Sequence, residues 1–163
     1  MANNHSNYAI IDVTPTLDTS EYADGDSLFN KHEIPNAVLG KGGTAELINV
    51  TVNSKKASAT PMEIILLGSD QSMEAANAAM NITAVEGTAA NFCGWVDIPA
   101  DGCLDMGNYI IGMPVNEAGA KPKLPFLVQA DSDSTSIFFT AIIGGTVTYA
   151  NGDLTFRFHF KQK

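Results

Sequence analysis

The sequence predicts an all-β protein, an antiparallel β-sandwich with a jelly-roll-like topology and at most one short helix. Its apolar residues come in short runs that are separated by Gly, Pro, Asn and Asp. Some runs alternate: Ile48, Val50 and Val52 fall on one face of a strand, and Asn49 and Thr51 on the other. Hydrophobic residues make up 45% of the chain and charged residues 17%, which is enough apolar material for a core. Short, two-faced strands of this kind favour two packed sheets.

Ten strands are expected from these runs. They lie at 8–13, 27–29, 45–52, 62–67, 92–98, 109–113, 126–129, 137–143, 146–150 and 154–160. The run at 62–67 is apolar almost throughout, so we expect it in the middle of a sheet.

A single helix is predicted over residues 69–80, where alanine, a strong helix former, occupies four of the five positions from 75 to 79. Ser69 or Ser72 could cap its first turn. We expect this helix to cross between the two sheets.

The strongest local signal is Asn151-Gly152, which suits the positive φ angles of a type I′ turn. It predicts a tight hairpin in which Tyr149 faces Leu154 and Val147 faces Phe156. The large apolar side chains of both strands then share one face, which needs a second sheet to cover it.

The chain of 163 residues fits one domain, which we place at residues 8–163 after a polar N-terminal arm at 1–7. The arm has neither the basic patch nor the apolar stretch of a secretion signal, and no apolar run reaches membrane-spanning length. We therefore expect the protein in the cytoplasm where it is made, or in a particle assembled there, without a membrane partner.

Charge argues against a nucleic-acid partner. Nine Lys and Arg residues against 18 Asp and Glu residues give a net charge of −9, which repels a phosphate backbone. Residues 1–30 and 57–120 contain no Lys or Arg at all, so a basic partner would meet these surfaces.

No pattern of catalytic or metal-binding residues stands out. Cys93 and Cys103 are not spaced as a metal knuckle, and the solitary histidines His5, His32 and His159 form no ligand pair. The chain has no Gly-x-Ser-x-Gly nucleophile motif. We therefore expect no enzyme activity, cofactor or metal.

Two acidic turns, Asp24-Gly25-Asp26 and Asp131-Ser132-Asp133, resemble fragments of calcium loops, with ordinary Asx-turns as the alternative interpretation. An exposed aromatic ring on a β-sandwich could also stack on a sugar. Trp95 and Tyr149 are expected in the core, and Tyr22 is the ring that we expect to be exposed.

Most of the chain resembles a family of small structural proteins from the virions of tailed bacteriophages. The similarity lies in VTPTLDTSEYADGD at 13–26, IPNA at 34–37, Gly42-Gly43, GMPV at 112–115 and GDLTFRF at 152–158. It implies a capsid decoration (cement) protein: a jelly roll bound to the major capsid protein on the outer surface of the head, commonly as a homotrimer. It carries over no catalytic residue.

The polar arm is the candidate contact element for the capsid or a neighbouring subunit, through Asn3, Asn4, His5 and Asn7. Two alternatives to the decoration role stay open. One is a carbohydrate-binding β-sandwich that uses Tyr22, Trp95 or the loop at 131–133, and the other is a head-fibre or tail component involved in host attachment.

Overall fold

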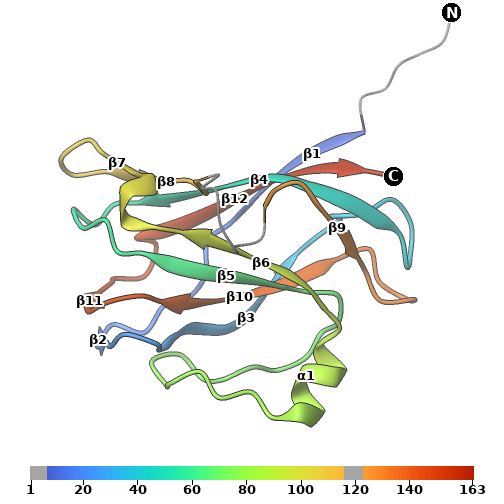
Figure 1. Cartoon of the computed structure of the whole chain (residues 1–163), viewed down its shortest axis with the longest axis horizontal. Coiled ribbons are helices and arrows are strands. Elements are labelled where there is room, and N and C mark those ends of the chain that lie inside the picture. The colour runs from blue at the N-terminus through green and yellow to red at the C-terminus, as the bar shows by residue number, and fades with distance from the viewer. Residues whose placement is uncertain (1–6, 116–122) are drawn as a thin grey trace, which may run out of the picture.

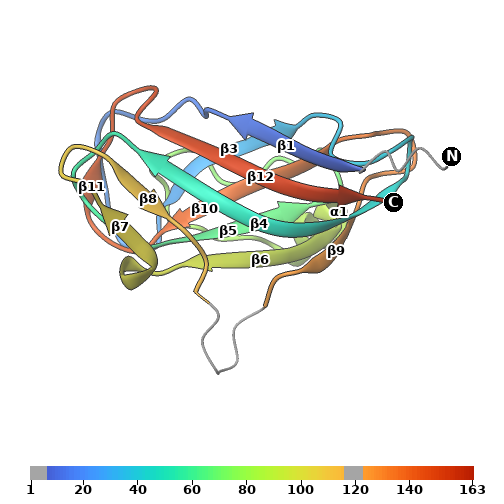
Figure 2. The same ribbon diagram turned by 90° about the horizontal axis from the view of Figure 1, so that it is seen from above.

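Two antiparallel sheets form the protein, and they are packed face to face (Figures 1 and 2). The computed structural model describes residues 7–115 and 123–163. The β12 sheet has the order β1-β12-β4-β8-β7, with β9 also paired to β4, and the β10 sheet has the order β3-β10-β5-β6. A separate two-stranded ribbon joins β2 to β11. The predicted all-β sandwich is confirmed.

The elements have the following bounds. The β12 sheet contains β1 (Tyr8–Val13), β4 (Thr44–Ser54), β7 (Cys103–Asp105), β8 (Ile110–Gly112), β9 (Phe126–Gln129) and β12 (Leu154–Gln162). The β10 sheet contains β3 (Ser27–Ile34), β5 (Met62–Leu67), β6 (Phe92–Ile98) and β10 (Ile137–Ile143). The remaining elements are β2 (Glu21–Tyr22), β11 (Val147–Thr148), the helix α1 (Ala84–Ala90) and a 3₁₀ turn, η1 (Ala100–Gly102).

The strand pairing is that of a jelly roll. Without the short β2, β7, β8 and β11, the first strand pairs with the last (β1 with β12), and β3 pairs with β10, β4 with β9 and β5 with β6. This nested order is that of a long hairpin rolled into two sheets. The pair β7–β8 is an addition between β6 and β9, and β8 lies along β4 beyond the end of β9.

Phenylalanine rings from both sheets fill the space between them. Phe156, Phe158 and Phe160 alternate along β12 and are fully buried, as the sequence predicts. From the β10 sheet, Phe139 approaches Phe156 and Phe158, with ring centroids 5.2 and 4.8 Å away. Phe29 of β3 meets Phe139 edge-on at 5.1 Å, so one aromatic cluster spans the sandwich.

The predicted helix at 69–80 is wrong. That segment runs beside the outer edge of β3, where the Asn77 N–H donates to the Ser27 carbonyl and the Ser27 N–H to the Ala78 carbonyl, at 2.9 and 2.8 Å. Pairing with an open strand edge outweighs the helix propensity of alanine. The helix begins later, at Ala84, where Thr83 and Glu86 form a capping box.

A turn forms at 150–153, but Asn151 lacks the positive φ of a type I′ turn, and the predicted hairpin does not form. The Asp153 N–H donates to the Ala150 carbonyl at 3.1 Å, and Gly152 has a φ of +82°. However, β11 pairs with β2, and β12 pairs with β1 and β4, so the chain crosses here from one sheet to the other. The Asn151 side chain accepts a hydrogen bond from the Leu17 N–H, which ties the turn to the segment after β1. The Asn-Gly pair predicts a turn, but burial of the aromatic face of β12 determines which strands pair on either side of it.

Replacing Phe139 should be costly because its ring connects the two sheets. We expect Phe139→Ala to lower the free energy of unfolding by about 3–5 kcal/mol, measured by urea denaturation. The matched control is Phe92→Ala, whose ring is 46% exposed and whose loss should cost about 1 kcal/mol. Equal costs for the two variants would contradict this account of the core.

Candidate functional site

The residues considered from the sequence for metal or acid–base chemistry are dispersed. Among the described residues, no group of three or more His, Cys, Asp or Glu side chains could hold a metal ion. His32 packs against the rings of Phe29 and Phe139, and burial lowers its pKa, so it is neutral at physiological pH. His159 is on the opposite sheet, in register with Asn49. The structure therefore does not bring these histidines together.

The two acidic turns use their carboxylates locally. In the first, Asp26 Oδ2 accepts a hydrogen bond of 2.7 Å from the Ala23 N–H. In the second, Asp131 Oδ1 accepts one of 2.7 Å from the Ser132 N–H. Both carboxylates are thus bonded within their own turns, although neither bond reaches the N–H two residues on that defines an Asx-turn.

The proposed contact arm lies mostly outside the described residues, since Asn3, Asn4 and His5 are not among them. Asn7 is described and exposed, and its carbonyl accepts a hydrogen bond of 2.7 Å from the Gln162 N–H near the end of β12. Residue 7 thus continues the pairing of β1 with β12.

Two aromatic predictions are wrong. Tyr22 is buried: its hydroxyl donates to the Leu28 carbonyl at 3.0 Å and accepts from the Asp18 N–H at 2.8 Å. Trp95, expected in the core, is 43% exposed. Tyr149 is buried as predicted, against Tyr22.

Trp95 faces outward by ordinary strand alternation, since Val96 and Ile98 are buried, and a β-bulge in β6 brings Phe92 to the same face. Residues three apart in a regular strand point to opposite faces. Here Trp95 pairs with Ile65 and Phe92 pairs with Leu67, with a register shift between Leu66 and Leu67. Because Ile65 and Leu67 both belong to the outer face of the β10 sheet, the bulge brings Phe92 and Trp95 to that same face.

Gly94 makes this bulge possible. Its φ is +152°, and a side chain there would place a Cβ atom 2.9 Å from a ring carbon of Phe126. The sequence signal that could have located the exposed Trp95 is Asp97, a charged residue two positions along the same strand, whereas Gly94 inside the strand pattern marks the bulge that moves Phe92.

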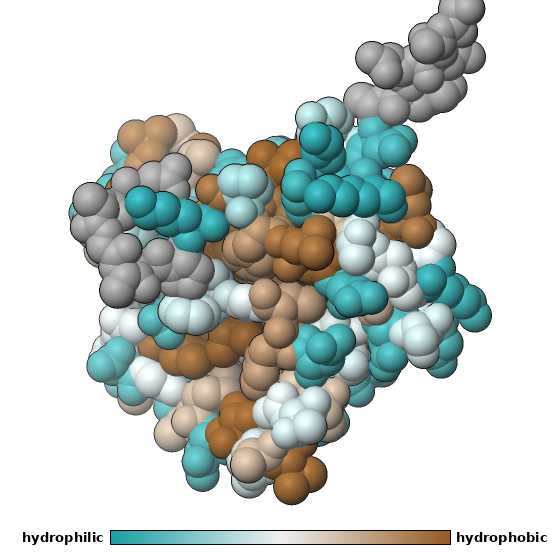
Figure 3. Space-filling view, turned by 45° about the vertical axis from the view of Figure 1, so that its right-hand side comes forward, coloured by the Kyte–Doolittle hydropathy of each residue, from teal (hydrophilic) through white to brown (hydrophobic). Residues whose placement is uncertain are grey.

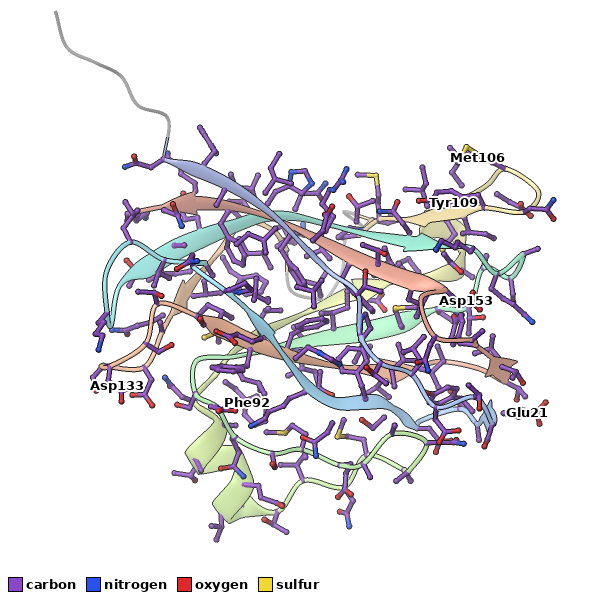
Figure 4. All side chains as sticks on the ribbon, turned by 180° about the vertical axis from the view of Figure 1, so that it is seen from behind. Glu21, Phe92, Met106, Tyr109, Asp133 and Asp153 are labelled. Atoms are coloured by element: carbon purple, nitrogen blue, oxygen red, sulfur yellow. The ribbon has the colours of Figure 1, made fainter. Side chains whose placement is uncertain are left out.

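The two rings line an open cleft of about 460 Å³ on the outer face of β5 and β6. This aromatic cleft is formed by Glu63, Ile65, Phe92, Cys93, Gly94 and Trp95. At one end, Phe92 lies beside α1, where a Cβ atom on Gly87 would meet its ring at 3.4 Å (Figure 4). A small second core of Leu67, Met73 and Ala90 holds α1 and the preceding segment against this face.

The other end of the aromatic cleft is acidic. Glu63 of β5 stands directly opposite Asp97 of β6, so two carboxylates occupy neighbouring positions next to the Ile65–Trp95 pair. A second hollow, of about 290 Å³, continues from Glu63 and includes Asp97 and Asp24. The cleft therefore combines flat apolar rings with negative charge.

A second surface feature is the hairpin formed by β7 and β8. Five of its residues and of the segment that follows are large, apolar and exposed: Leu104, Met106, Tyr109, Met113 and Val115. Met106 and Tyr109 are at its tip, far from Phe92 (Figure 4). The base is fixed, because Ile110 is buried and a Cβ on Gly112 would lie 2.8 Å from Ile98.

The space-filling view also shows hydrophobic residues at the surface in several areas, including a band that runs down towards the level of α1 (Figure 3). Contiguous exposed apolar areas mark interaction sites in proteins of this size. Burial raises the pKa of the Cys93 and Cys103 thiols, so neither is an activated thiol. Among the described residues, no helix is long and apolar enough to cross a bilayer.

The charge beside Trp95 can be measured with collisional quenchers, because Trp95 is the chain's single tryptophan. At low ionic strength we expect caesium to quench its fluorescence better than iodide does, after each is normalised to a free tryptophan amide. Glu63→Gln should reduce the caesium preference. A preference for iodide would contradict the acidic assignment.

Thiol reactivity gives a second test. Because burial raises the pKa of both thiols, the thiolate fraction at pH 7 is smaller than for an ordinary cysteine. We expect reaction with a disulfide reagent to be slower than for glutathione at pH 7, and its rate to keep rising with pH beyond the usual thiol pKa, where the rate for an ordinary thiol levels off. A fast reaction at neutral pH would show an activated cysteine instead.

Comparisons with protein-family models, with curated proteins and with solved structures found no match for this chain. The interpretation of the aromatic cleft and of the β7–β8 hairpin therefore depends on their own geometry and chemistry.

Proposed function

We propose that the chain is a capsid decoration (cement) protein of a tailed bacteriophage, which binds the major capsid protein on the outer surface of the head and stabilises the shell. The observation that carries the proposal is the exposed apolar β7–β8 hairpin on a stable jelly roll. Jelly rolls occur in viral capsid and lectin domains, so the fold is compatible with this role without specifying it. The similarity of residues 13–26 and 152–158 to virion proteins supports the same choice.

The hairpin has the composition and the rigidity of a docking element. Met and Tyr are enriched in protein interfaces, where a few buried anchors supply most of the affinity. Leu104 is 60% exposed and Met106 is 52% exposed, so burying them against a shell would remove apolar area from water. The pairing of β8 with β4 holds these side chains in place before contact, which lowers the entropy cost of docking.

Assembly as a homotrimer is part of the proposal, because three linked contacts raise the effective affinity by roughly 10²-fold or more. Each hairpin contact could then be weak on its own. The N-terminal arm remains a candidate second contact. Since Asn7 already pairs with Gln162, its contribution is best tested by deleting residues 1–6 only, and unchanged capsid occupancy and oligomer mass would remove the arm from the mechanism.

The structure supports the carbohydrate-binding alternative less than the sequence did. Of its three features, Tyr22 is buried and Asp131 caps its own turn, which leaves Trp95. The head-fibre or tail alternative differs from decoration in copy number, so counting copies in the particle separates the two.

The decoration role predicts a high copy number and a specific effect of the hairpin. Mass spectrometry of purified particles should find copies comparable in number to the major capsid protein, whereas a few copies would indicate a fibre or tail component. In reconstitution on capsids that lack the protein, Leu104→Ser should weaken binding about tenfold, as loss of an interface anchor does.

The matched control is Val85→Ser on α1, which removes an apolar side chain that is 79% exposed at a distant surface. It should leave capsid occupancy unchanged. Absence of the protein from particles, or equal effects of the two substitutions, would contradict the proposal.

A further inference from the structure

We propose that the aromatic cleft between β5 and β6 binds an arginine side chain from a basic segment of a partner protein. This binding site is separate from the β7–β8 hairpin, and the inference does not depend on the decoration role. Three features of the cleft support this proposal: its flat aromatic rings, its negative charge and the small number of polar side chains that line it.

The rings provide a surface for a planar cation. Phe92 and Trp95 are 46% and 43% exposed and reach the same face only because of the bulge at Cys93 and Gly94. Because both rings line one cleft, a ligand that covers them removes apolar area from water. A guanidinium group stacks on indole through both its planar shape and cation–π attraction, and its aliphatic stem can lie along Ile65.

Local charge selects a cation. Glu63 lines the cleft, Asp97 is directly across from it, and Asp24 borders the adjoining hollow. Residues 57–115, which include both strands of the cleft, contain no Lys or Arg. Lys31 is a cation of the same sheet, but its ammonium group already lies over the Phe138 ring and is paired with Asp70.

The lining distinguishes arginine from a neutral sugar. Of the six described residues that form the cleft, only Glu63 and Trp95 have a side-chain oxygen or nitrogen atom: the carboxylate is an acceptor and the indole N–H is a single donor. A sugar needs several polar partners for its hydroxyl groups, because unpaired hydroxyls lose their hydrogen bonds to water on burial. An arginine needs only a ring to stack on and a carboxylate to accept its N–H groups, and a carboxylate can accept two of them at once.

The direct test is a fluorescence titration of the full chain with tri-arginine peptide, because the only tryptophan lies in the cleft. Tri-citrulline, a neutral peptide of nearly the same shape, and a trisaccharide of N-acetylglucosamine are titrated in parallel. We expect a saturable change in Trp95 emission with tri-arginine alone, and weaker binding as salt is added.

Variants separate the cleft from the general negative charge of the protein. Glu63→Gln should weaken tri-arginine binding about threefold to tenfold, since it removes the carboxylate that lines the cleft. The matched control is Glu21→Gln on β2, which removes the same charge outside the cleft, on the opposite side of the view from Phe92 in Figure 4. It should change the affinity less than about twofold. Thermal melting of each variant checks that the fold is kept.

Equal weakening by Glu63→Gln and Glu21→Gln would overturn the proposal, because attraction would then come from net charge alone. So would the absence of a saturable response to tri-arginine, or saturation by the trisaccharide in its place, which would make the cleft a glycan site. Because the titration uses no capsid, its failure is distinguishable from failure of the decoration role, which particle occupancy tests.

Discussion

The contact between Phe139 and the rings of β12 is the interaction on which the structure depends. A jelly roll brings together strands that are far apart in the sequence, so its two sheets are held mainly by what lies between them. Phe139 touches Phe156 and Phe158 from the opposite sheet and meets Phe29 on its own sheet. The outer face of the β10 sheet carries only a small second core under α1, and the rest of that face can carry features such as an exposed tryptophan.

The sequence predicts strands well and their partners poorly. Alternation along residues 154–160 correctly predicts which faces are buried, because that pattern depends only on the period of a strand. The hairpin at Asn151-Gly152 fails because the same turn can end a sheet or join two sheets, and burial of Phe156 and Phe158 decides between them. The helix at 69–80 fails for a related reason: the open edge of β3 offers its backbone groups better partners than a short helix does.

The candidate site was harder to predict than the fold. Trp95 sits in an apolar run, but it alternates with the buried Val96 and shares its face with Asp97. Strand periodicity cannot show the one-residue bulge that brings Phe92 to the same face. Tyr22 shows the opposite error: it follows acidic and polar residues in sequence, yet its hydroxyl is satisfied by Leu28 and Asp18, so the ring can be buried. The acidic character of residues 57–120 was visible in the sequence, but its position beside two aromatic rings was not.

β4 pairs along one edge with two strands in succession: Thr44–Leu47 with β9, and Val52–Ser54 with β8. The jelly roll is complete with β9 alone, so the β7–β8 hairpin is an accessory that shares a strand with the core without interrupting its order. Evolution could lengthen, shorten or exchange such a hairpin while the eight main strands keep their register. The binding surface on the hairpin could thus change faster in evolution than the eight strands that present it. For the same reason, this hairpin is a suitable position for grafting a foreign peptide.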